Sequence, residues 1–301
     1  AECSEDMWTH QYLQMANQIE CVPFPGKAIF RTDGCESHLF GLEPNFGCCT
    51  ANFNQAWPKF ALNTFMKSEN GIACTLFAPS ELRTVIEGNA VSVTLKTDYP
   101  FGDMLCYTVS AESPTRFDFS VRIPEWSRGI VSNMPYKAEN GFIHFEKQWK
   151  GKDTVELEFI RRISLDPRPG DMRTLDYGPL VFALPVKGEW ERREYTNGGV
   201  ERRFPYCDYF IHRKSDWNYA FDSESFEIVP GEIGEHPFSE NKPPLTVKAK
   251  LRRIEWGFAD GYTTVCAPYP MSRIPIGETE EMTLIPYGCT TLRMTEMPLL
   301  P

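Results

Sequence analysis

Two cysteines stand side by side in this chain, in the stretch Gly47-Cys48-Cys49-Thr50-Ala51-Asn52. Adjacent thiols at the start of a helix can share one soft metal ion, and one of them can then act as an activated nucleophile. The same pair also has two structural interpretations, as buried apolar thiols or as a vicinal disulfide. The chain has 10 cysteines, so the surrounding residues must decide between these roles.

The residues that follow the pair favour the chemical role. Apolar side chains recur at helical spacing through residues 53–65, which predicts a helix with one apolar face. Thr50 or Asn52 can cap its start, and Glu69-Asn70-Gly71 can end it. The cysteines then lie at the amino-terminal end of the helix. Its dipole and free N–H groups favour thiolate over thiol there.

Composition indicates a globular, acidic chain. Its 301 residues are 42% hydrophobic and 13% aromatic, enough for two or three folded units. The net charge is −10 and there is no block of Lys or Arg, which argues against nucleic-acid partners and anionic membranes. No apolar run is long enough to span a bilayer, and no Gly-rich phosphate loop is present. The cysteines are spread out, which favours mostly reduced thiols.

The first residues, Ala1 to Asp6, include neither an initiator methionine nor a signal sequence. We therefore expect this chain to be a downstream piece of a longer protein. A periplasmic, a secreted and a cytoplasmic location all stay open.

Residues 1–66 are predicted to form helix and loop. Trp8, Tyr12, Met15 and Ile19 have helical spacing, whereas prolines and glycines in residues 23–34 predict a long loop up to Cys48.

From Gly71 onwards the period of the apolar residues changes to two, which predicts strands. These strands are expected around residues 91–95, 105–109, 117–123, 155–159, 180–184, 245–251 and 282–284. Turn signals at residues 87–89, 139–141 and 150–153 separate the first of them. Short strands at this spacing predict antiparallel sandwiches, and residues 167–170 are the best candidate for a linker.

Read together, several stretches resemble the cysteine-dependent β-L-arabinofuranosidase family of glycoside hydrolases, long described as a domain of unknown function. The double-cysteine motif is the most specific of them. The matching stretches are residues 8–12, 41–52, 122–126, 177–182 and 285–293.

The resemblance implies a mainly β chain. Residues 1–66 would be the carboxy-terminal remnant of a truncated (α/α)6 barrel, 67–169 a first antiparallel β-sandwich and 170–301 a second. It also implies a zinc ion held by Cys48, Cys49 and the glutamate and cysteine of an upstream Glu-x-Cys motif. Cys48 would be the nucleophile, and another upstream glutamate the general acid and base. Neither upstream element is in this sequence; Cys3 follows Glu2 directly and does not match.

Three further residues are candidates for binding the sugar. His10 and Tyr12 lie in a matching stretch and can line a sugar pocket, or they can be an ordinary structural pair. Glu43 lies five residues before Cys48 and can reach the sugar or the surroundings of the metal, or it can be a solvated loop residue.

The leading hypothesis is the carboxy-terminal part of a retaining glycoside hydrolase that acts on an L-arabinofuranoside-type glycan, with a zinc-bound thiolate in place of the attacking carboxylate. The alternative is a non-catalytic β-sandwich module that binds carbohydrate or mediates assembly. We expect zinc in the complete protein but not necessarily in this chain. Because the upstream elements are missing, we expect the chain alone to be inactive. We also expect it to form a homo-oligomer through apolar helix faces around residues 8–19 and 53–65.

Overall fold

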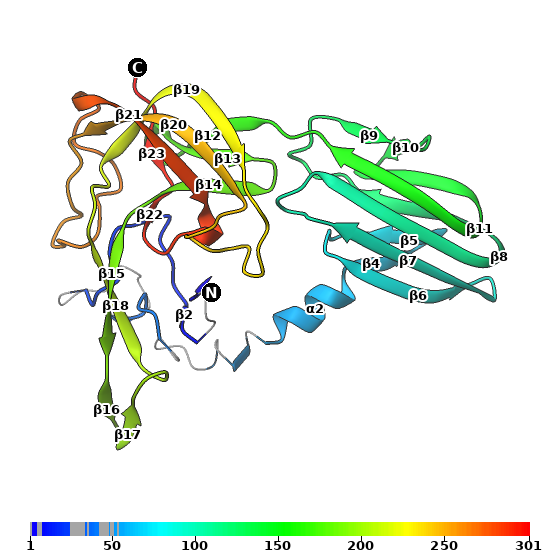
Figure 1. The fold of residues 1–301 in the computed structure, drawn as a ribbon, viewed down its shortest axis with the longest axis horizontal. Coiled ribbons are helices and arrows are strands. Elements are labelled where there is room, and N and C mark those ends of the chain that lie inside the picture. Colours follow the sequence, from blue (N-terminus) through cyan, green and yellow to red (C-terminus); the bar gives the residue numbers. More distant parts are fainter. Residues whose placement is uncertain are drawn as a thin grey trace. The chain divides into compact units, whose positions relative to one another are not determined.

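The computed structural model describes residues 2–4, 8–24, 34, 36–41, 48, 51–52 and 54–301. These residues are mainly β, as expected, with short helical segments (Figure 1). Contacts divide the chain into two units. We call Asn54–Arg162 the middle unit, and Ala1–Phe53 with Ile163–Pro301 the split unit. The finer assignment of a barrel remnant and two sandwiches stays a prediction. No helix among the described residues is long and apolar enough to cross a membrane.

The middle unit is built on one eight-stranded sheet, in which β5 and β8 pair in parallel and the other pairs are antiparallel. The order is β10-β11-β8-β5-β4, with β7 also on β8, β6 on β7 and β9 on β11. Its elements are α2 (Ala56–Leu62), β4 (Phe65–Ser68), β5 (Gly71–Cys74), β6 (Ser80–Ile86), β7 (Asn89–Thr97), β8 (Met104–Arg122), β9 (Ile130–Ser132), β10 (Lys137–Glu139) and β11 (Phe142–Phe159).

Strand β8 bends back on itself, so that the two halves of the sheet share one core. Tyr107 and Phe119 both lie on β8, yet their ring centroids are 5.0 Å apart. Twelve residues of straight strand would span roughly 40 Å. The bend lies where the β8–β11 register shifts, next to Pro114, which has no N–H to donate to the ladder.

The predicted turns have two different outcomes. Those at 87–89 and 139–141 are confirmed, and positive φ angles at Gly88 and Gly141 close the hairpins β6–β7 and β10–β11. The turn expected at 150–153 is wrong. Gly151 lies inside β11 with φ 68°, at the register shift opposite the bend in β8.

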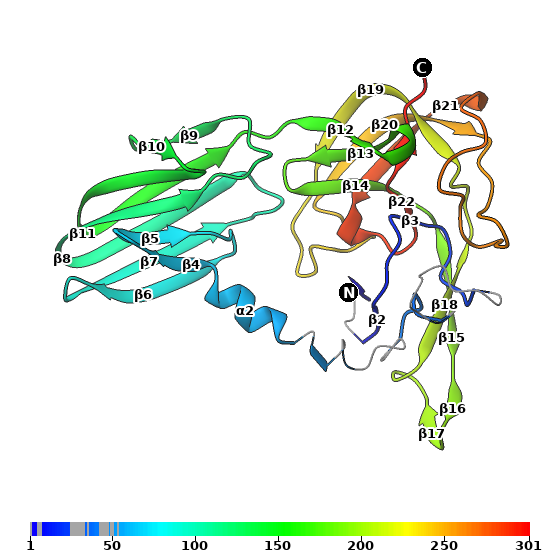
Figure 2. The same cartoon turned by 180° about the vertical axis from the view of Figure 1, so that it is seen from behind.

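The split unit contains a nine-stranded sheet and a projecting arm of two successive hairpins (Figures 1 and 2). The sheet order is β12-β13-β14-β21-β20-β19, with β3, β22 and β23 attached. These strands are β3 (Asn17–Gln18), β12 (Ile163–Arg168), β13 (Met172–Tyr177), β14 (Leu180–Pro185), β19 (Tyr219–Pro230), β20 (Leu245–Ile254), β21 (Pro275–Pro286), β22 (Arg293–Met294) and β23 (Met297–Pro298).

The arm pairs β15 (Gly188–Arg193) with β18 (Asp208–Arg213), and carries the hairpin of β16 (Tyr195–Asn197) and β17 (Val200–Arg202). A short pair, β1 (Glu2–Cys3) and β2 (His10–Gln11), lies near the start of the chain. The expected linker at 167–170 instead belongs to the β12–β13 hairpin. The boundary between the two units lies between Arg162 and Ile163.

The helix expected around residues 8–19 is wrong. These residues form β2, β3 and bends instead. Asn17 and Gln18 pair with Met294 and Arg293, so their backbone groups are satisfied by a segment far away in the sequence. Tertiary pairing therefore overrides the helical spacing.

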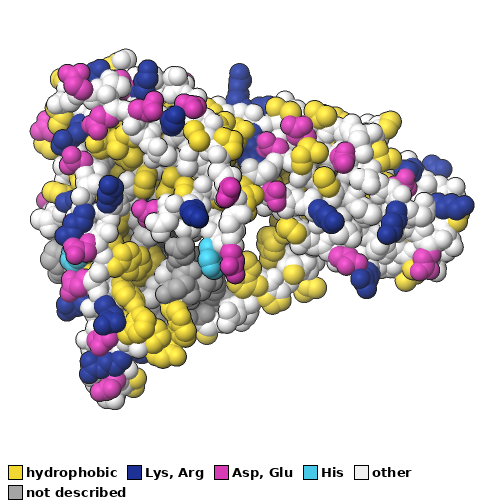
Figure 3. Space-filling model, viewed as in Figure 1, with side chains coloured by type: hydrophobic (Ala, Val, Ile, Leu, Met, Phe, Trp, Pro, Cys, Tyr) yellow, Lys and Arg dark blue, Asp and Glu magenta, His cyan; other side chains and the backbone are white. Residues whose placement is uncertain are grey.

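The helix expected after the cysteines is shorter than predicted. Helix α2 ends at Leu62, and Phe65 already belongs to strand β4. No α2 side chain is buried, so its apolar residues remain at the surface. Figure 3 shows hydrophobic side chains gathered over this helix.

Candidate active site

Cys48 is exposed and has helical backbone geometry, as do Ala51 and Asn52, upstream of α2. Cys49 and Glu43 lie outside the described residues. Within the described part of the chain, no three His, Cys, Asp or Glu side chains gather into a group that could hold a metal ion. An exposed thiol suits zinc as a donor, but the described residues do not complete a ligand set, so the zinc site stays a prediction.

His10 is held against the residue from which the cysteine motif starts. Its backbone N–H donates to the Gly41 carbonyl at 3.0 Å, and the Gly41 N–H donates to the His10 carbonyl at 3.1 Å. Burial lowers the pKa of the half-buried imidazole. The ring is therefore neutral near pH 7 and can both donate and accept a hydrogen bond. Tyr12 follows β2 and is exposed.

Residues 40–41 are anchored on their other side by the arm. The Tyr209 N–H on β18 donates to the Phe40 carbonyl at 2.8 Å. A β-carbon at Gly41 would overlap Asp208 Oδ1, so any residue other than glycine requires the Asp208 carboxylate to move. The structure thus brings β2, residues 40–41 and β18 together at the entry to the cysteine motif.

A tyrosine from the outer hairpin of the arm also holds Asp208 in place. The Tyr195 hydroxyl donates to Asp208 Oδ2 at 2.7 Å. Burial raises the pKa of Asp208, and burial together with the Asp208 carboxylate raises the pKa of Tyr195 to about 12. The phenol therefore stays protonated near neutral pH and remains a donor to Asp208. Sequence reasoning missed both residues. The glycine at position 41, which permits a close backbone approach, is the signal that could have pointed to them.

Two buried glutamines tie the early segment to the end of the chain. Gln11 Nε2 donates to Gln18 Oε1 at 2.9 Å, and Gln18 Nε2 donates to the Thr291 carbonyl at 2.8 Å. Arg293 is fully buried, and its guanidinium donates to the Tyr287 hydroxyl at 2.8 Å. The matching stretches 8–12 and 285–293 are therefore linked through Gln18.

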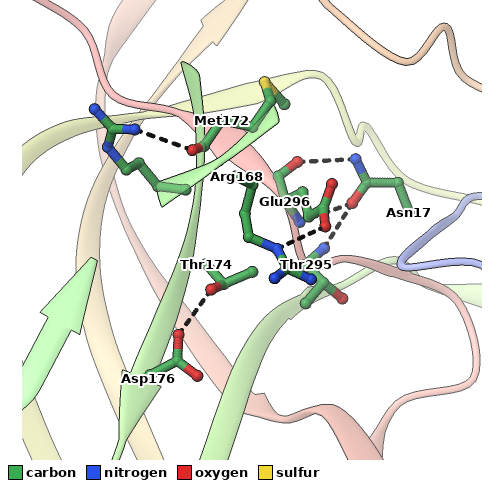
Figure 4. A network of polar contacts seen from close by, with 8 residues as sticks. Asn17, Arg168, Met172, Thr174, Asp176, Thr295 and Glu296 are labelled. Carbon is green, nitrogen blue, oxygen red and sulfur yellow. Dashed lines mark hydrogen bonds and ion pairs between the residues drawn. The ribbon is translucent and has the colours of Figure 1, made fainter. Parts of the chain in front are cut away.

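Asn17 makes a second tie, with the residues before β23 (Figure 4). Its Oδ1 accepts from the N–H groups of Thr295 at 2.8 Å and Glu296 at 2.9 Å, and its Nδ2 donates to the Glu296 carbonyl at 2.8 Å. The Glu296 carboxylate in turn pairs with Arg168 at 3.0 Å. One amide thus satisfies three backbone groups.

Trp217 and Tyr219 do not offer a surface on which a sugar ring could stack. Both side chains are buried. Trp217 packs against Trp256 and Phe258, with ring centroids 5.8 and 5.9 Å away. Trp217, Tyr219 and Trp256 therefore belong to the core of the split unit, whereas Phe258 is partly exposed.

Comparison with known proteins identifies the middle unit. Residues 71–161 match the family described as the β-L-arabinofuranosidase GH127 middle domain. This confirms the resemblance drawn from the sequence motifs. No curated protein matches the chain.

Three solved structures share the fold. One is Ara127N-Se, a GH127 β-L-arabinofuranosidase from Geobacillus stearothermophilus T6, with TM-score 0.57 and 19% identity over 84% of this chain and 37% of that one. Another is a GH127 β-arabinofuranosidase, with TM-score 0.58 and 13% identity over 84% of this chain and 39% of its own. A third, a glycoside hydrolase, has TM-score 0.57 and 18% identity, covering 100% of this chain and 46% of its own. This chain therefore spans less than half the length of each.

Proposed function

Because residues 71–161 carry the GH127 middle domain, we propose that this chain is the carboxy-terminal part of a retaining glycoside hydrolase that acts on L-arabinofuranosides. The family match, with a Cys48-Cys49 pair upstream of it in the same chain, is the observation that carries the proposal. The solved structure of similar fold that is named a β-L-arabinofuranosidase supports the choice of sugar.

Cys48 is the proposed nucleophile. Its sulfur forms a bond to the anomeric carbon as the glycosidic oxygen leaves with a proton from the general acid, and water then releases the sugar, so that configuration is retained over two displacements. Cys48 and Cys49 are proposed zinc ligands, and a bound zinc ion would favour the thiolate form of the nucleophile at neutral pH.

His10, Tyr12 and Glu43 are the proposed substrate contacts. A neutral His10 imidazole suits sugar hydroxyls, which both donate and accept hydrogen bonds. The exposed Tyr12 ring can pack against a sugar, and the Glu43 carboxylate can accept from hydroxyl groups. The anchoring of residues 40–41 by His10 and Tyr209 supports this assignment, because it fixes the backbone from which the motif starts.

The remaining parts of the site would come from outside these 301 residues. The general acid and the glutamate and cysteine of the Glu-x-Cys motif have no counterpart in this sequence. The solved structures of similar fold are more than twice as long as this chain. Activity is therefore proposed for the complete protein and not for this chain alone.

The test is Cys48→Ser in the complete protein, with Cys106→Ser as the matched control. Cys106 is a partly exposed thiol on β8, outside the proposed site. We expect Cys48→Ser to retain less than about a tenth of the wild-type kcat on an aryl L-arabinofuranoside and to hold less zinc by elemental analysis, because a serine hydroxyl is a poor nucleophile and a poor zinc ligand. Full activity in Cys48→Ser would remove Cys48 from the nucleophile role. A complete protein that binds the glycan without cleaving it would favour the non-catalytic module.

A further inference from the structure

The split unit also contains a cavity large enough for a small molecule. This cavity of about 740 Å³ lies between the arm and the segments around residues 236–241 and 288–291. Ser4 and Thr9, next to β2, contribute to its wall. Its volume falls in the range of small-molecule sites, roughly 300 to 1,000 Å³. Figure 3 shows hydrophobic side chains gathered beside the arm.

Aromatic rings form one part of the wall. Trp190 on β15 packs edge-on against Tyr209 and Phe40, with centroid distances of 5.6 and 5.3 Å, which hold the indole in place. The residue nevertheless remains 42% exposed. Phe238 lies against the backbone of Gly288, where a β-carbon would be 2.8 Å from the ring. A fixed, partly exposed indole is a suitable surface for the apolar face of a sugar.

The rest of the cavity wall carries polar side chains that can still form hydrogen bonds with a ligand. The Thr9 side chain is 3% exposed, and its hydroxyl has no hydrogen-bond partner among the described residues. Glu240, Asn241 and the Trp190 indole N–H likewise make no side-chain hydrogen bond to any residue that the structure describes. Partial burial raises the pKa of Glu240, although its side chain keeps contact with solvent. A ligand rich in hydroxyl groups would satisfy these donors and acceptors together.

The charged side chains of the cavity wall favour a neutral ligand over an anionic one. Glu240 is the one acidic side chain among the described lining residues, and His236 is the one basic side chain, with no Lys or Arg among them. An anionic ligand such as a phosphate or a uronic acid would meet a carboxylate with no Lys or Arg to compensate for it. A neutral sugar carries no such penalty.

We propose that this cavity is a glycan-binding site that takes a neutral sugar unit, with Trp190 against the sugar ring and Thr9, Glu240 and Asn241 as hydrogen-bonding partners of its hydroxyls. The choice of an L-arabinofuranose unit rests on the proposed function; the site itself does not use Cys48. A chain with this site can hold a glycan through the split unit whether or not the cysteine chemistry is complete.

The test measures binding by the 301-residue chain after treatment with a chelator, so that zinc chemistry does not contribute. Isothermal titration calorimetry and saturation-transfer NMR with an L-arabinofuranose oligosaccharide give the Kd and the sugar protons in contact. We expect saturable binding that Trp190→Ala weakens by about tenfold or more, as expected for loss of an aromatic contact worth ~1 to 2 kcal/mol. Trp190→Phe should recover part of the affinity, and Glu240→Gln should weaken it less than Trp190→Ala.

Phe204→Ala is the matched control, because Phe204 is an exposed aromatic of the arm that does not line the cavity. Its Kd should equal that of the unmodified chain. Absence of saturable binding, or equal affinity in Trp190→Ala, would overturn the proposal. Tighter binding of choline than of the sugar would identify a cation site instead.

Cys48→Ser separates this proposal from the proposed function. Cys48→Ser should bind the oligosaccharide with unchanged Kd, because the cavity lacks Cys48. A complete protein that binds the oligosaccharide but has no activity would contradict the hydrolase proposal and support the glycan-binding cavity. A complete protein that is active but shows no binding dependent on Trp190 would contradict the glycan-binding cavity and support the hydrolase proposal.

Discussion

The backbone of Gly41 lies so close to the Asp208 carboxylate that a β-carbon on residue 41 would overlap Asp208 Oδ1. Gly41 leads into the cysteine motif, whereas Asp208 belongs to the arm. The Tyr195 hydroxyl fixes the other carboxylate oxygen, so Asp208 cannot turn away without losing that bond. The arm therefore disfavours any residue other than glycine at the start of the motif.

Gly41→Ala should destabilise the split unit by about 1 to 3 kcal/mol, the usual cost of inserting a methyl group into a packed contact. Urea unfolding followed by circular dichroism measures this free energy. Gly34→Ala is the control, because no atom lies within 4 Å of a β-carbon placed there. Equal costs at the two positions would contradict the contact.

Asp208→Ala should relieve part of the cost of Gly41→Ala. The clashing oxygen is then gone, and the next atom of residue 208 that a β-carbon would meet beyond the carboxylate is its α-carbon, at 3.6 Å. The two substitutions should therefore be non-additive in a double-mutant cycle. An additive pair would mean that the overlap with Asp208 does not cause the destabilisation.

His38 should make the stability of the split unit depend on pH. The ring is fully buried and stacked on Phe24, with centroids 3.8 Å apart, and burial lowers its pKa to about 4. Below the ordinary pKa of about 6.5 the unfolded chain binds a proton that the folded chain does not, so stability should fall as the pH drops from about 6.5 to 4. The expected loss over this range is roughly 3 kcal/mol.

His38→Phe retains an aromatic ring against Phe24 and removes the titrating group. Unfolding free energies at several pH values between 4 and 7 should show a shallower slope for this variant than for the unmodified chain. His236→Phe, at an exposed position, should leave the slope as it is. A slope unchanged in His38→Phe would show that other groups cause the acid sensitivity.

Asn17→Ala should destabilise the chain by about 1 to 3 kcal/mol, because two backbone N–H groups, of Thr295 and Glu296, lose their acceptor. Asn17→Asp keeps the oxygen and loses only the donor to the Glu296 carbonyl, so it should cost less. Thermal unfolding measures both variants. A larger loss in Asn17→Asp than in Asn17→Ala would contradict the geometry in Figure 4.

Regular strands were predictable from the sequence where side chains alternate between core and solvent. Val91, Val93 and Leu95 are buried on β7, as their spacing indicates. The bend of β8 was not predictable, because it depends on how β8 and β11 pair, with a register shift between Trp149 and Gly151 on β11. Two expected strands, around 105–109 and 117–123, are in fact one.

The candidate site was predictable only in part. The cysteine motif and the match of residues 8–12 came from the sequence, and the structure places His10 beside Gly41. Asp208, Tyr195 and the cavity around Trp190 were not predicted from the sequence, because segments that are far apart in the chain form them. The helical spacing of residues 8–19 also led to a wrong prediction, because β3 pairs with β22 near the end of the chain.

The 301-residue chain should release no product from an aryl L-arabinofuranoside, even with added zinc. The proposed chemistry needs a general acid and two more zinc ligands that this sequence does not supply. A chromogenic release assay over several hours measures this. Turnover that disappears in Cys48→Ser would mean that residues within 1–301 build the whole site.

The chain should also self-associate through the surface around α2. Trp57, Phe60 and Leu62 are 60%, 44% and 78% exposed, and Met66 on β4 is 48% exposed. Exposed apolar side chains gathered in this way are uncommon on a monomer, because burying them against another copy removes them from water. Light scattering after size-exclusion chromatography should give a mass above 34.5 kDa, and the double substitution Trp57→Glu with Leu62→Lys should return it to that value. Val131→Lys, at an exposed valine of β9, is the control and should leave the association unchanged. A monomeric mass for the unmodified chain would contradict the prediction, because the apolar surface would then be exposed to solvent.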